Sequence, residues 1–306
     1  MNTKNTNIIK ISEDLSGQRI DNFLLKKLKG VPKSLIYKLV RSGQVRVNMK
    51  RCAVSYRIAA NDYIRIPPNI LKDRALSEKI NYNYKDYIHY ENVDLMVLNK
   101  PSGIAVHSGT NQKADFLSSL QNAMNNNDLS LVHRLDKNTS GCLLISKNYK
   151  TASVLGKKFA NKDIKKKYYA LLTGKLNQNI IEIDTNIIKD SYAKKMKIDN
   201  DHGKEAHTKI TVLKRYKHYT YVEVEILTGR MHQIRAHTSS IGHPIAGDNK
   251  YSSINDKINN KSIKLNRLFL HSFYISFYLH RQYEFILDLP YELKEVLSNL
   301  EEFDER

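Results

Sequence analysis

The chain of 306 residues has little of several residue types, and each scarcity argues against a class of protein. It has two cysteines, Cys52 and Cys142, far apart and without a C-x-x-C pair, which argues against a disulfide framework and against a zinc knuckle. Its longest apolar run, LFLHSFYISFYL at residues 268–279, is interrupted by His271 and two serines and is too short to span a bilayer. We also expect no signal peptide, and therefore a cytoplasmic protein.

Acidic residues are scarce as well. The chain has 31 Asp and Glu against 50 Lys and Arg, for a formal net charge of +19, and the excess is unevenly spread. Residues 1–74 alone contain nine Lys, seven Arg and five acids, a net charge of +11, which leaves +8 for the rest of the chain. This asymmetry indicates a polyanion-binding module ahead of a more balanced body, although a solvated Lys-rich surface would have the same composition.

Residues 16–68 show the pattern of two helices followed by a small β unit. Apolar residues recur at helical spacing from Ile20 to Leu28 and again from Leu35 to Val40, with Gly30 and Pro32 between them as stop and start signals. The alternating stretches QVRVN and DYIRIPP predict two short strands. Basic side chains cluster on this unit: Lys33, Lys38, Arg41, Arg46, Lys50 and Arg51.

The rest of the chain alternates strand and helix patterns after a polar linker near residues 69–86, and it has no internal repeat. Strands are predicted at 94–100, 142–148, 166–176 and 219–227, and helices at 149–161 and 231–241. Two polar, Asn- and Lys-rich stretches, about 190–206 and 252–264, are expected to form loops.

The stretch LVHRLDKNTSG, residues 131–141, places one acid, Asp136, between Arg134 and Lys137 on the approach to a Thr-Ser-Gly turn. Asp136 is open to three interpretations: a surface ion pair, a kinase-type base or a nucleophile. A kinase HRD motif needs the acid directly after the arginine, but Leu135 intervenes here, and neither a Gly-rich loop nor a DFG motif follows. Phosphoryl transfer from ATP is therefore disfavoured.

Metal and serine-hydrolase chemistry are disfavoured as well. His232, His237 and His243 are close in sequence, but no HExxH motif or Cys/His ligand set accompanies them, so we interpret them as ordinary helix and loop histidines. The chain also lacks the G-x-S-x-G nucleophile elbow of serine hydrolases. No metal is expected.

What is left is a carboxylate beside cations in a chain whose charge distribution indicates a polyanion-binding module. Neighbouring cations favour the ionised form of a carboxyl group. An ionised Asp is a poor general acid, but it can act as a nucleophile or stabilise a cationic sugar centre. Asp136 therefore suits cleavage of a glycosidic bond without a cofactor.

Four motifs, in order, resemble the RluA family of pseudouridine synthases. They are VLNKPSGIAVH, VHRLDKNTSG, KKYYALLTG and LTGRMHQIRAHTSSIGHPIAGDNKY, and they span roughly residues 90–251. The helix-Gly-strand order and the basic positions of residues 16–68 resemble an S4 RNA-binding domain. One motif alone would be a weak signal, but four in order together with the S4-like unit are specific.

The resemblance implies an α+β fold in two domains. We expect an N-terminal S4-like RNA-binding domain over residues 1–74, a linker over 75–86 and a pseudouridine synthase catalytic domain over 87–306. The catalytic domain is expected to contain a mixed, largely antiparallel, bent sheet with flanking helices and a cleft along the sheet.

The resemblance also assigns roles to single residues. Asp136 matches the catalytic aspartate, and Tyr168 matches the tyrosine that stacks on the target base and helps to remove its C5 proton. Arg235 matches the basic residue that pairs with the aspartate, with Arg230 as its rival, and Tyr169 is the rival of Tyr168. The residues expected to contact RNA or to place the catalytic loop are His133, Arg134, Arg230, His232, Lys100, Lys33, Lys38, Arg41, Arg46, Lys50 and Arg51.

The implied reaction is the isomerisation of selected uridines in 23S ribosomal RNA to pseudouridine, on a base flipped out of its helix and with no cofactor. The implied partner is that RNA or a large-subunit assembly intermediate, and we expect a monomer that does not bind membranes. Two rival functions are open. A non-catalytic S4 protein would not need the 131–141 stretch, and a methyltransferase would need a cofactor loop, yet no G-x-G-x-x-G follows a strand.

Overall fold

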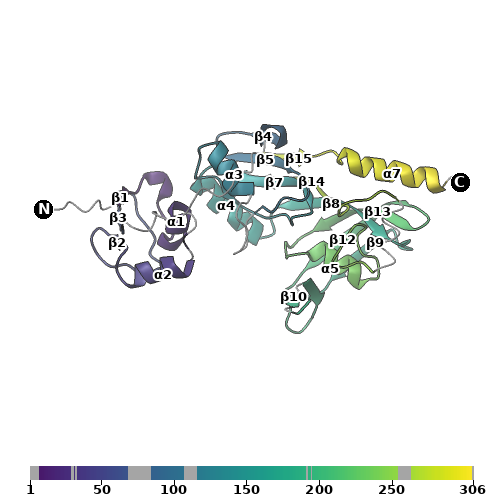
Figure 1. Ribbon diagram of the computed structural model, residues 1–306, viewed down its shortest axis with the longest axis horizontal. Helices are drawn as coiled ribbons and strands as arrows, with labels where there is room; N and C mark the ends of the chain where they lie inside the picture. Colours follow the sequence, from purple (N-terminus) through teal and green to yellow (C-terminus); the bar gives the residue numbers. More distant parts are fainter. Residues whose placement is uncertain are drawn as a thin grey trace.

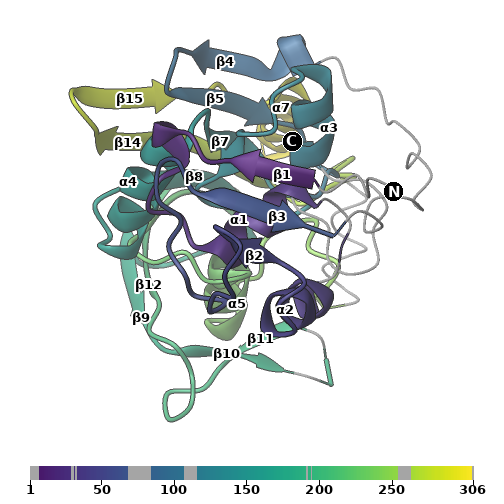
Figure 2. The ribbon, with the colours of Figure 1, turned by 90° about the vertical axis from the view of Figure 1, so that its left-hand side faces the viewer.

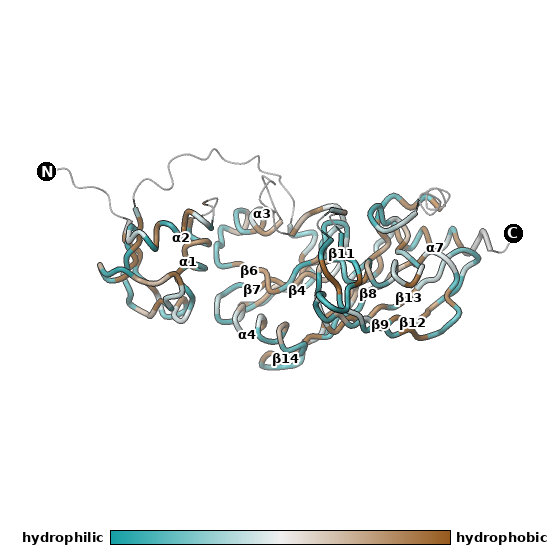
Figure 3. The backbone as a smooth tube through the Cα atoms, turned by 90° about the horizontal axis from the view of Figure 1, so that it is seen from below, coloured by the Kyte–Doolittle hydropathy of each residue, from teal (hydrophilic) through white to brown (hydrophobic). Residues whose placement is uncertain are grey.

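The structure, a computed structural model, describes residues 7–28, 31, 33–67, 84–106, 116–190, 192–193, 195–253 and 263–304. Figure 1 shows an elongated molecule with a small N-terminal domain at one end, a large sheet in the middle and helix α7 (Tyr291–Asp304) at the other end, and Figure 3 gives the same order from below. The expected boundary at residue 74 and the linker residues 75–83 lie outside the described residues. The domain boundaries therefore stay a prediction.

The N-terminal domain has the two helices and the two strands that its residue pattern predicts, and one further strand ahead of the helices. A short 3-10 helix, η1 (Glu13–Leu15), precedes helices α1 (Ile20–Lys27) and α2 (Lys33–Arg41). Three antiparallel strands follow the order β1 (Asn7–Lys10), β3 (Tyr63–Ile66), β2 (Arg46–Val47), as Figure 2 shows from this end of the molecule.

Apolar side chains from these helices and strands form a core that belongs to the N-terminal domain alone. Ile36 and Val40 of α2 are buried in it, but Leu35 is 41% exposed, so the predicted apolar stripe of this helix is one residue too wide. A helix turns about 100° per residue, and the side chain that precedes Ile36 therefore points away from the core. The predicted signals Gly30 and Pro32 lie outside the described residues.

The second domain is organised around a ten-stranded sheet. Its main order is β4 (Ile88–Glu91), β5 (Leu95–Lys100), β7 (Ser140–Ser146), β14 (Leu270–Tyr278), β8 (Lys165–Thr173), β13 (Tyr219–Ile226), β12 (His207–Arg215) and β9 (Ile180–Asp184). Strand β15 (Gln282–Ile286) pairs with β14, and β6 (Ser130–Leu131) pairs with β7. Among the described strands only β7 and β14 are paired in parallel. The sheet is thus mixed and largely antiparallel, and the α+β prediction is confirmed.

Helices cover both faces of this sheet. The larger core contains side chains of α3 (Phe116–Ala123), α5 (Gln233–Ser240) and α7, whereas Leu155 of α4 (Tyr149–Ala160) packs into a second core on the other face. A short 3-10 helix, η2 (Tyr84–Tyr87), leads into β4. None of the described helices is long and apolar enough to cross a membrane.

Strand β7 is buried on both faces, which explains the apolar run CLLI at its centre. Leu143 and Ile145 lie in the larger core, while Cys142 and Leu144 lie in the second core. Successive side chains of a strand point to opposite faces, so a strand between two cores needs apolar residues at every position. The loop that contains Asp136 and precedes β7 is therefore attached to a strand buried on both faces.

One expected loop contains a strand. Residues 190–206 include β11 (Lys195–Ile198), which pairs antiparallel with β10 (Ile187–Asp190) in a hairpin outside the main sheet. Met196 of β11 is buried against Ala236 of α5. A contact with a distant helix, rather than the polar local sequence, stabilises this strand, and for that reason the loop prediction was wrong here.

The two domains touch through α1 and α4. The ammonium of Lys26 donates to the hydroxyl of Ser130 at 2.9 Å and lies 5.9 Å from the ring centre of Tyr149. Burial lowers the pKa of Lys26, while the charge of Asp128 opposes this effect. The N-terminal domain thereby supplies one side chain to the cavity described below.

Gly141 is required where β7 passes β14. Its φ is +113°, and a Cβ at this position would lie 2.1 Å from the carbonyl oxygen of Ser272. Gly141→Ala is expected to lower the free energy of unfolding by about 2–5 kcal/mol, through overpacking and backbone strain. Gly156→Ala is the matched control, because this position in α4 has open space and the change should raise stability by about 0.5–1 kcal/mol. Chemical denaturation of the two variants checks this, and equal stabilities would contradict it.

Candidate active site

Asp136 lies on a loop between β6 and β7, and residues 102 and 103 hold this loop through hydrogen bonds to its backbone carbonyls. The N–H of Gly103 donates to the carbonyl of Lys137 at 2.9 Å, and the hydroxyl of Ser102 donates to the carbonyl of Asn138 at 2.7 Å. The Asp136 side chain is 26% exposed. Its carboxylate is therefore fixed in place but accessible from the cavity.

Lys100 supports the same loop from inside the protein. Its side chain is fully buried, and its ammonium donates to three backbone carbonyls, those of Pro101 at 2.8 Å, Ile104 at 2.9 Å and Lys137 at 3.2 Å. Burial, together with the charge of Arg267, lowers the pKa of Lys100 to about 7. Because the buried ammonium meets backbone acceptors, it is better placed to hold the loop than to contact RNA phosphate.

His133 also holds the loop. Its Nε2 accepts a hydrogen bond from the N–H of Leu144 at 2.9 Å, and its ring stacks on Phe159 with the centroids 4.9 Å apart. Burial, and secondly the charge of Lys166, lower the pKa of His133 to about 3. The imidazole is therefore neutral, with its proton on Nδ1. These contacts favour a role in placing the loop over a contact with RNA.

Arg235 is shared between two carboxylates. Its Nη1 lies 3.6 Å from Oδ2 of Asp136, while its Nε and Nη2 donate to the two oxygens of Asp248 at 2.6 and 2.7 Å. Arg235 and Asp248 are both buried. Burial alone would lower the pKa of Arg235, but the hydrogen bonds and charge of Asp248, and then the charge of Asp136, raise it. The guanidinium is thus permanently charged and held at one angle.

His232 is the second basic side chain beside the aspartate. It precedes α5 in a left-handed conformation, with φ of 52°, and its Nε2 lies 3.9 Å from Oδ2 of Asp136. Burial lowers the pKa of His232 despite the carboxylate nearby. Tyr251 holds both basic groups, since its hydroxyl is 3.2 Å from Nδ1 of His232 and its ring centre is 5.1 Å from the Arg235 guanidinium.

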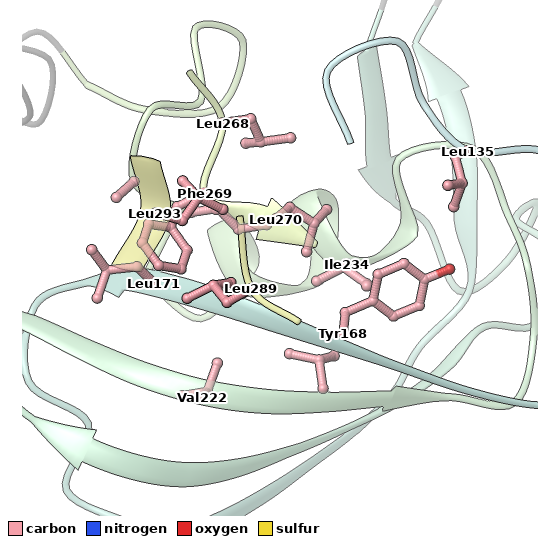
Figure 4. Packing of buried hydrophobic residues seen from close by; sticks show 14 of the residues in the cluster. Leu135, Tyr168, Leu171, Val222, Ile234, Leu268, Phe269, Leu270, Leu289 and Leu293 are labelled. Carbon is pink, nitrogen blue, oxygen red and sulfur yellow. The ribbon is translucent and has the colours of Figure 1, made fainter. Parts of the chain in front are cut away.

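The two adjacent tyrosines of β8 face opposite sides of the sheet. Tyr168 is 7% exposed, lines the cavity together with Asp136, and points its hydroxyl toward the side on which Leu135 lies (Figure 4). Tyr169 stacks on Phe273, with ring centroids 3.8 Å apart. Burial raises the pKa of Tyr168, so its hydroxyl is neutral at physiological pH. The structure therefore places Tyr168, and not its neighbour, beside the aspartate.

A cavity of about 1070 Å³ connects these groups, which is large enough for a nucleotide. Asp136, Tyr168 and Arg235 line it, and the exposed side chains of Arg134 and Arg230 lie along it. The Nε of Arg230 donates to the carbonyl of Glu205 at 3.0 Å. Among the described residues the guanidinium within 4 Å of Asp136 is that of Arg235, so the structure decides between the two rival arginines.

The basic residues predicted on the N-terminal domain are mostly at its surface. Lys33, Lys38 and Arg41 project from α2, where Lys33 and Arg41 lie over the ring of Tyr37 at 5.3 and 5.8 Å. Lys50 and Arg51 are exposed after β2. Arg46 is only partly exposed and donates to the carbonyls of Gly43 and Met49, so it stabilises a turn. These contacts leave five of the six predicted cations available to a polyanion.

None of the three histidines considered as metal ligands joins another in the described structure. His232 contacts Tyr251, His237 lies 2.9 Å from the hydroxyl of Thr208, and His243 lies 2.9 Å from the carbonyl of Thr173. Elsewhere, among the described residues, a surface group could offer three ligand atoms: Asp199, Asp201 and His202. The cavity beside Asp136 is not lined by that group.

Sequence reasoning missed Asp248, Tyr251 and Lys166 as site residues. Asp248 and Tyr251 lie in the AGDNKY end of the last recognised motif, and Lys166 is the lysine two residues before Tyr168. The available signal was a lone acid, Asp248, in a basic motif, the same signal that singled out Asp136. Its buried partner, Arg235, could be identified only from the fold.

A fixed carboxylate in a cation-lined cavity, next to a buried tyrosine and preceded by a basic domain, is the arrangement expected of an enzyme that acts on RNA. Comparison with known families agrees. Residues 94–240 match the RNA pseudouridylate synthase family model, and residues 18–64 match the S4 domain model. The chain belongs to the RNA pseudouridylate synthase family, which confirms the resemblance seen in its motifs.

Relatives of known name extend the likeness over most of the chain. Ribosomal large subunit pseudouridine synthase C of Vibrio vulnificus is 41% identical over 277 residues, which cover 88% of each chain. The protein of the same name from Haemophilus influenzae is 40% identical and covers 96% of this chain and 95% of its own length. The solved structure of human RNA Pseudouridylate Synthase Domain Containing 1 is 26% identical, with a TM-score of 0.58, and covers 67% of this chain and 84% of its own.

Lys100→Met tests the structural role of the buried lysine. Removing the ammonium takes a hydrogen bond from each of three carbonyls, of which that of Lys137 keeps the Gly103 N–H as a donor, and the free energy of unfolding should fall by about 1–3 kcal/mol. Lys137→Met, at an exposed position of the same loop, should leave stability nearly unchanged. Thermal unfolding of the two variants is the measurement. A Lys100 variant as stable as the unmodified protein would show that the three hydrogen bonds contribute nothing.

Proposed function

We propose that this enzyme isomerises selected uridines of 23S ribosomal RNA to pseudouridine, with Asp136 as the nucleophile. The single observation that supports this best is the accessible Asp136 carboxylate, 3.6 Å from Arg235 in a cavity that Tyr168 also lines. The printed names of the relatives support ribosomal RNA as the substrate. Action as a monomer in the cytoplasm, on RNA or on an assembly particle, is part of the same proposal.

The target uridine has to leave its helix before Asp136 can reach it. The sugar carbon C1′ and the base are shielded inside a stacked strand, so the nucleotide is flipped into the cavity at a cost of a few kcal/mol. Tyr168 offers one face of its ring to the flipped base, because the tyrosine side chain lines the cavity. Arg134 and Arg230, which are exposed along the cavity, bind the RNA around it.

The isomerisation needs no external reactant. Attack of an Asp136 oxygen on C1′ breaks the bond from C1′ to N1 of uracil, or Asp136 removes a sugar proton to give a glycal, and in both routes the electron pair of the broken bond goes to N1. Uracil then turns and C5 bonds to C1′, which breaks the bond from Asp136 to C1′ in the first route, while in the glycal route Asp136 returns the proton to the sugar. C5 finally loses its proton and N1 gains one. The atoms of substrate and product are the same, so nothing is hydrolysed.

The shared guanidinium explains how Asp136 stays reactive. Asp248 takes two hydrogen bonds from Arg235 at 2.6 and 2.7 Å, whereas Asp136 lies 3.6 Å from the remaining nitrogen. The two carboxylates and one guanidinium together keep a net negative charge. Arg235 therefore orients Asp136 without holding its oxygens in short hydrogen bonds, which leaves a lone pair for the sugar.

Asp136→Asn keeps the size of the side chain but removes the charge that the mechanism uses. Release of tritium from C5-labelled uridine in a ribosomal RNA transcript should fall to background, while RNA binding is retained. Asp163→Asn, an exposed position after α4, is the control and should react normally. Activity of Asp136→Asn within about tenfold of the unmodified enzyme would rule out the nucleophile role.

Tyr168→Phe separates stacking from the hydroxyl. Burial keeps the Tyr168 hydroxyl protonated, so help with the C5 proton requires this group to lose its own proton first. The variant keeps a ring worth about 1–3 kcal/mol of stacking and should bind RNA normally but turn over far more slowly. Tyr168→Leu should lose the stacking too, and Tyr169→Phe, on the other face, should change little. Single-turnover assays decide this, and a dead Tyr169→Phe beside an active Tyr168→Phe would reverse the assignment.

A further inference from the structure

Three consecutive lysines of β8 differ in what their ammonium groups meet. Lys165 pairs with Glu225 at 3.6 Å, and Lys167 pairs with Glu223 at 2.7 Å, both across to β13. Lys166 points to the opposite face, because successive side chains of a strand alternate. It lines the cavity that contains Asp136. Two of the three lysines are thus neutralised by glutamates, and the third is directed into the active-site cavity.

Lys166 is a buried cation without an anionic partner among the described residues. It is 6% exposed, and its ammonium lies 5.7 Å from the ring centre of Phe159, a contact that does not neutralise its charge. Burial lowers the pKa of Lys166 to about 8. A buried charge is costly unless it is paired. An anion that entered the cavity would therefore be stabilised at this point more than at an exposed lysine.

Two neighbours of Lys166, His133 and Tyr168, add no competing charge. The imidazole of His133 is neutral, because burial and the charge of Lys166 lower its pKa. The Nε2 acceptor of that ring already accepts a hydrogen bond from the N–H of Leu144. The hydroxyl of Tyr168, on the same strand face, is neutral as well. The ammonium of Lys166 thus keeps hydrogen-bond donors for a ligand in the cavity.

The position of Lys166 relative to Tyr168 fits the backbone of the nucleotide that is flipped. The two residues are two apart on one strand face, which separates their Cα atoms by about 7 Å. A base stacked on Tyr168 brings its own sugar and phosphate into the same cavity. A lysine has a flexible four-carbon stem and a compact charge with three donors, which suits a phosphate oxygen at this range.

We propose that Lys166 is a phosphate-binding residue of the active site, which holds a phosphodiester of the RNA strand next to the flipped uridine. This inference rests on the proposed function, since it takes its ligand from an RNA strand in the cavity. It adds a contact inside the catalytic domain to the surface cations of the N-terminal domain. The contact positions the nucleotide for Asp136 and does not take part in bond exchange.

The test compares Lys166→Met, Lys166→Arg and Lys165→Met in the full chain. Lys165→Met removes the same charge from the adjacent residue on the other strand face, so it is the matched control. Binding of a 23S ribosomal RNA transcript is measured between 50 and 200 mM salt, about the range in which phosphate contacts dominate the salt dependence. Lys166→Met should weaken binding at least about fivefold, through loss of a charge-assisted contact. The slope of log affinity against log salt should fall by about 0.7, the value for one contact on a single strand.

Lys166→Arg should restore the slope, Lys165→Met should keep it, and KM of Lys166→Met should rise while kcat stays within about threefold. An unchanged slope and KM for Lys166→Met, or a fall in kcat alone, would overturn the phosphate contact. If Lys166→Met lost thermal stability but had the same salt slope as Lys166→Arg, Lys166 would be a packing residue and the phosphate contact would be refuted. RNA binding is measured without turnover. An active Asp136→Asn variant would therefore refute the proposed nucleophile but would not affect the comparison of RNA binding among the Lys166 variants.

Discussion

The ion pair between Arg235 and Asp248 is the contact on which the active site depends. Both side chains are buried, and Asp248 also accepts the backbone N–H groups of Lys250 at 2.9 Å and Tyr251 at 3.2 Å. Two of the three guanidinium nitrogens are thereby occupied by Asp248, and Nη1 is the nitrogen nearest to Asp136. The pair converts a flexible arginine into a rigid, permanently charged partner for the aspartate. If either residue were replaced alone, the other would be a buried charge without a partner, and the free energy of unfolding would fall by about 3–5 kcal/mol.

The loop that carries Asp136 is held from the other side by Lys100 and His133. Lys100 donates to three carbonyls from beneath the loop, and His133 accepts the Leu144 N–H while its ring packs on Phe159. These contacts connect Asp136 to β5 and β7, strands that are buried between two cores. The proposed reaction depends on the placement of the Asp136 carboxylate, and hydrogen bonds to the backbone of its loop fix that placement.

Strand alternation decides which of several similar side chains enters the cavity. On β8 the even-numbered Lys166 and Tyr168 lie on the cavity side, and the odd-numbered Lys167 and Tyr169 lie on the other. A shift of one residue in the pairing of β8 with β14 would exchange these sets. The register, set by pairs such as Ser272 with Tyr168, is therefore as important to the site as the identity of the residues.

Local sequence determined much of this protein. Helices α1 and α2 and strands β2 and β3 follow from patterns within about ten to twenty residues, because helix and strand periodicity and turn chemistry act at that range. The α+β class and the choice of Asp136 followed from the motifs and their resemblance to a known family. The preference for Arg235 over Arg230, the burial of Lys100, the partner role of Asp248 and the strand β11 were decided by the tertiary structure. Each of them depends on a contact with a residue on another element, or on which side of a strand meets a core, and such contacts exist only after the sheet has closed around its two cores.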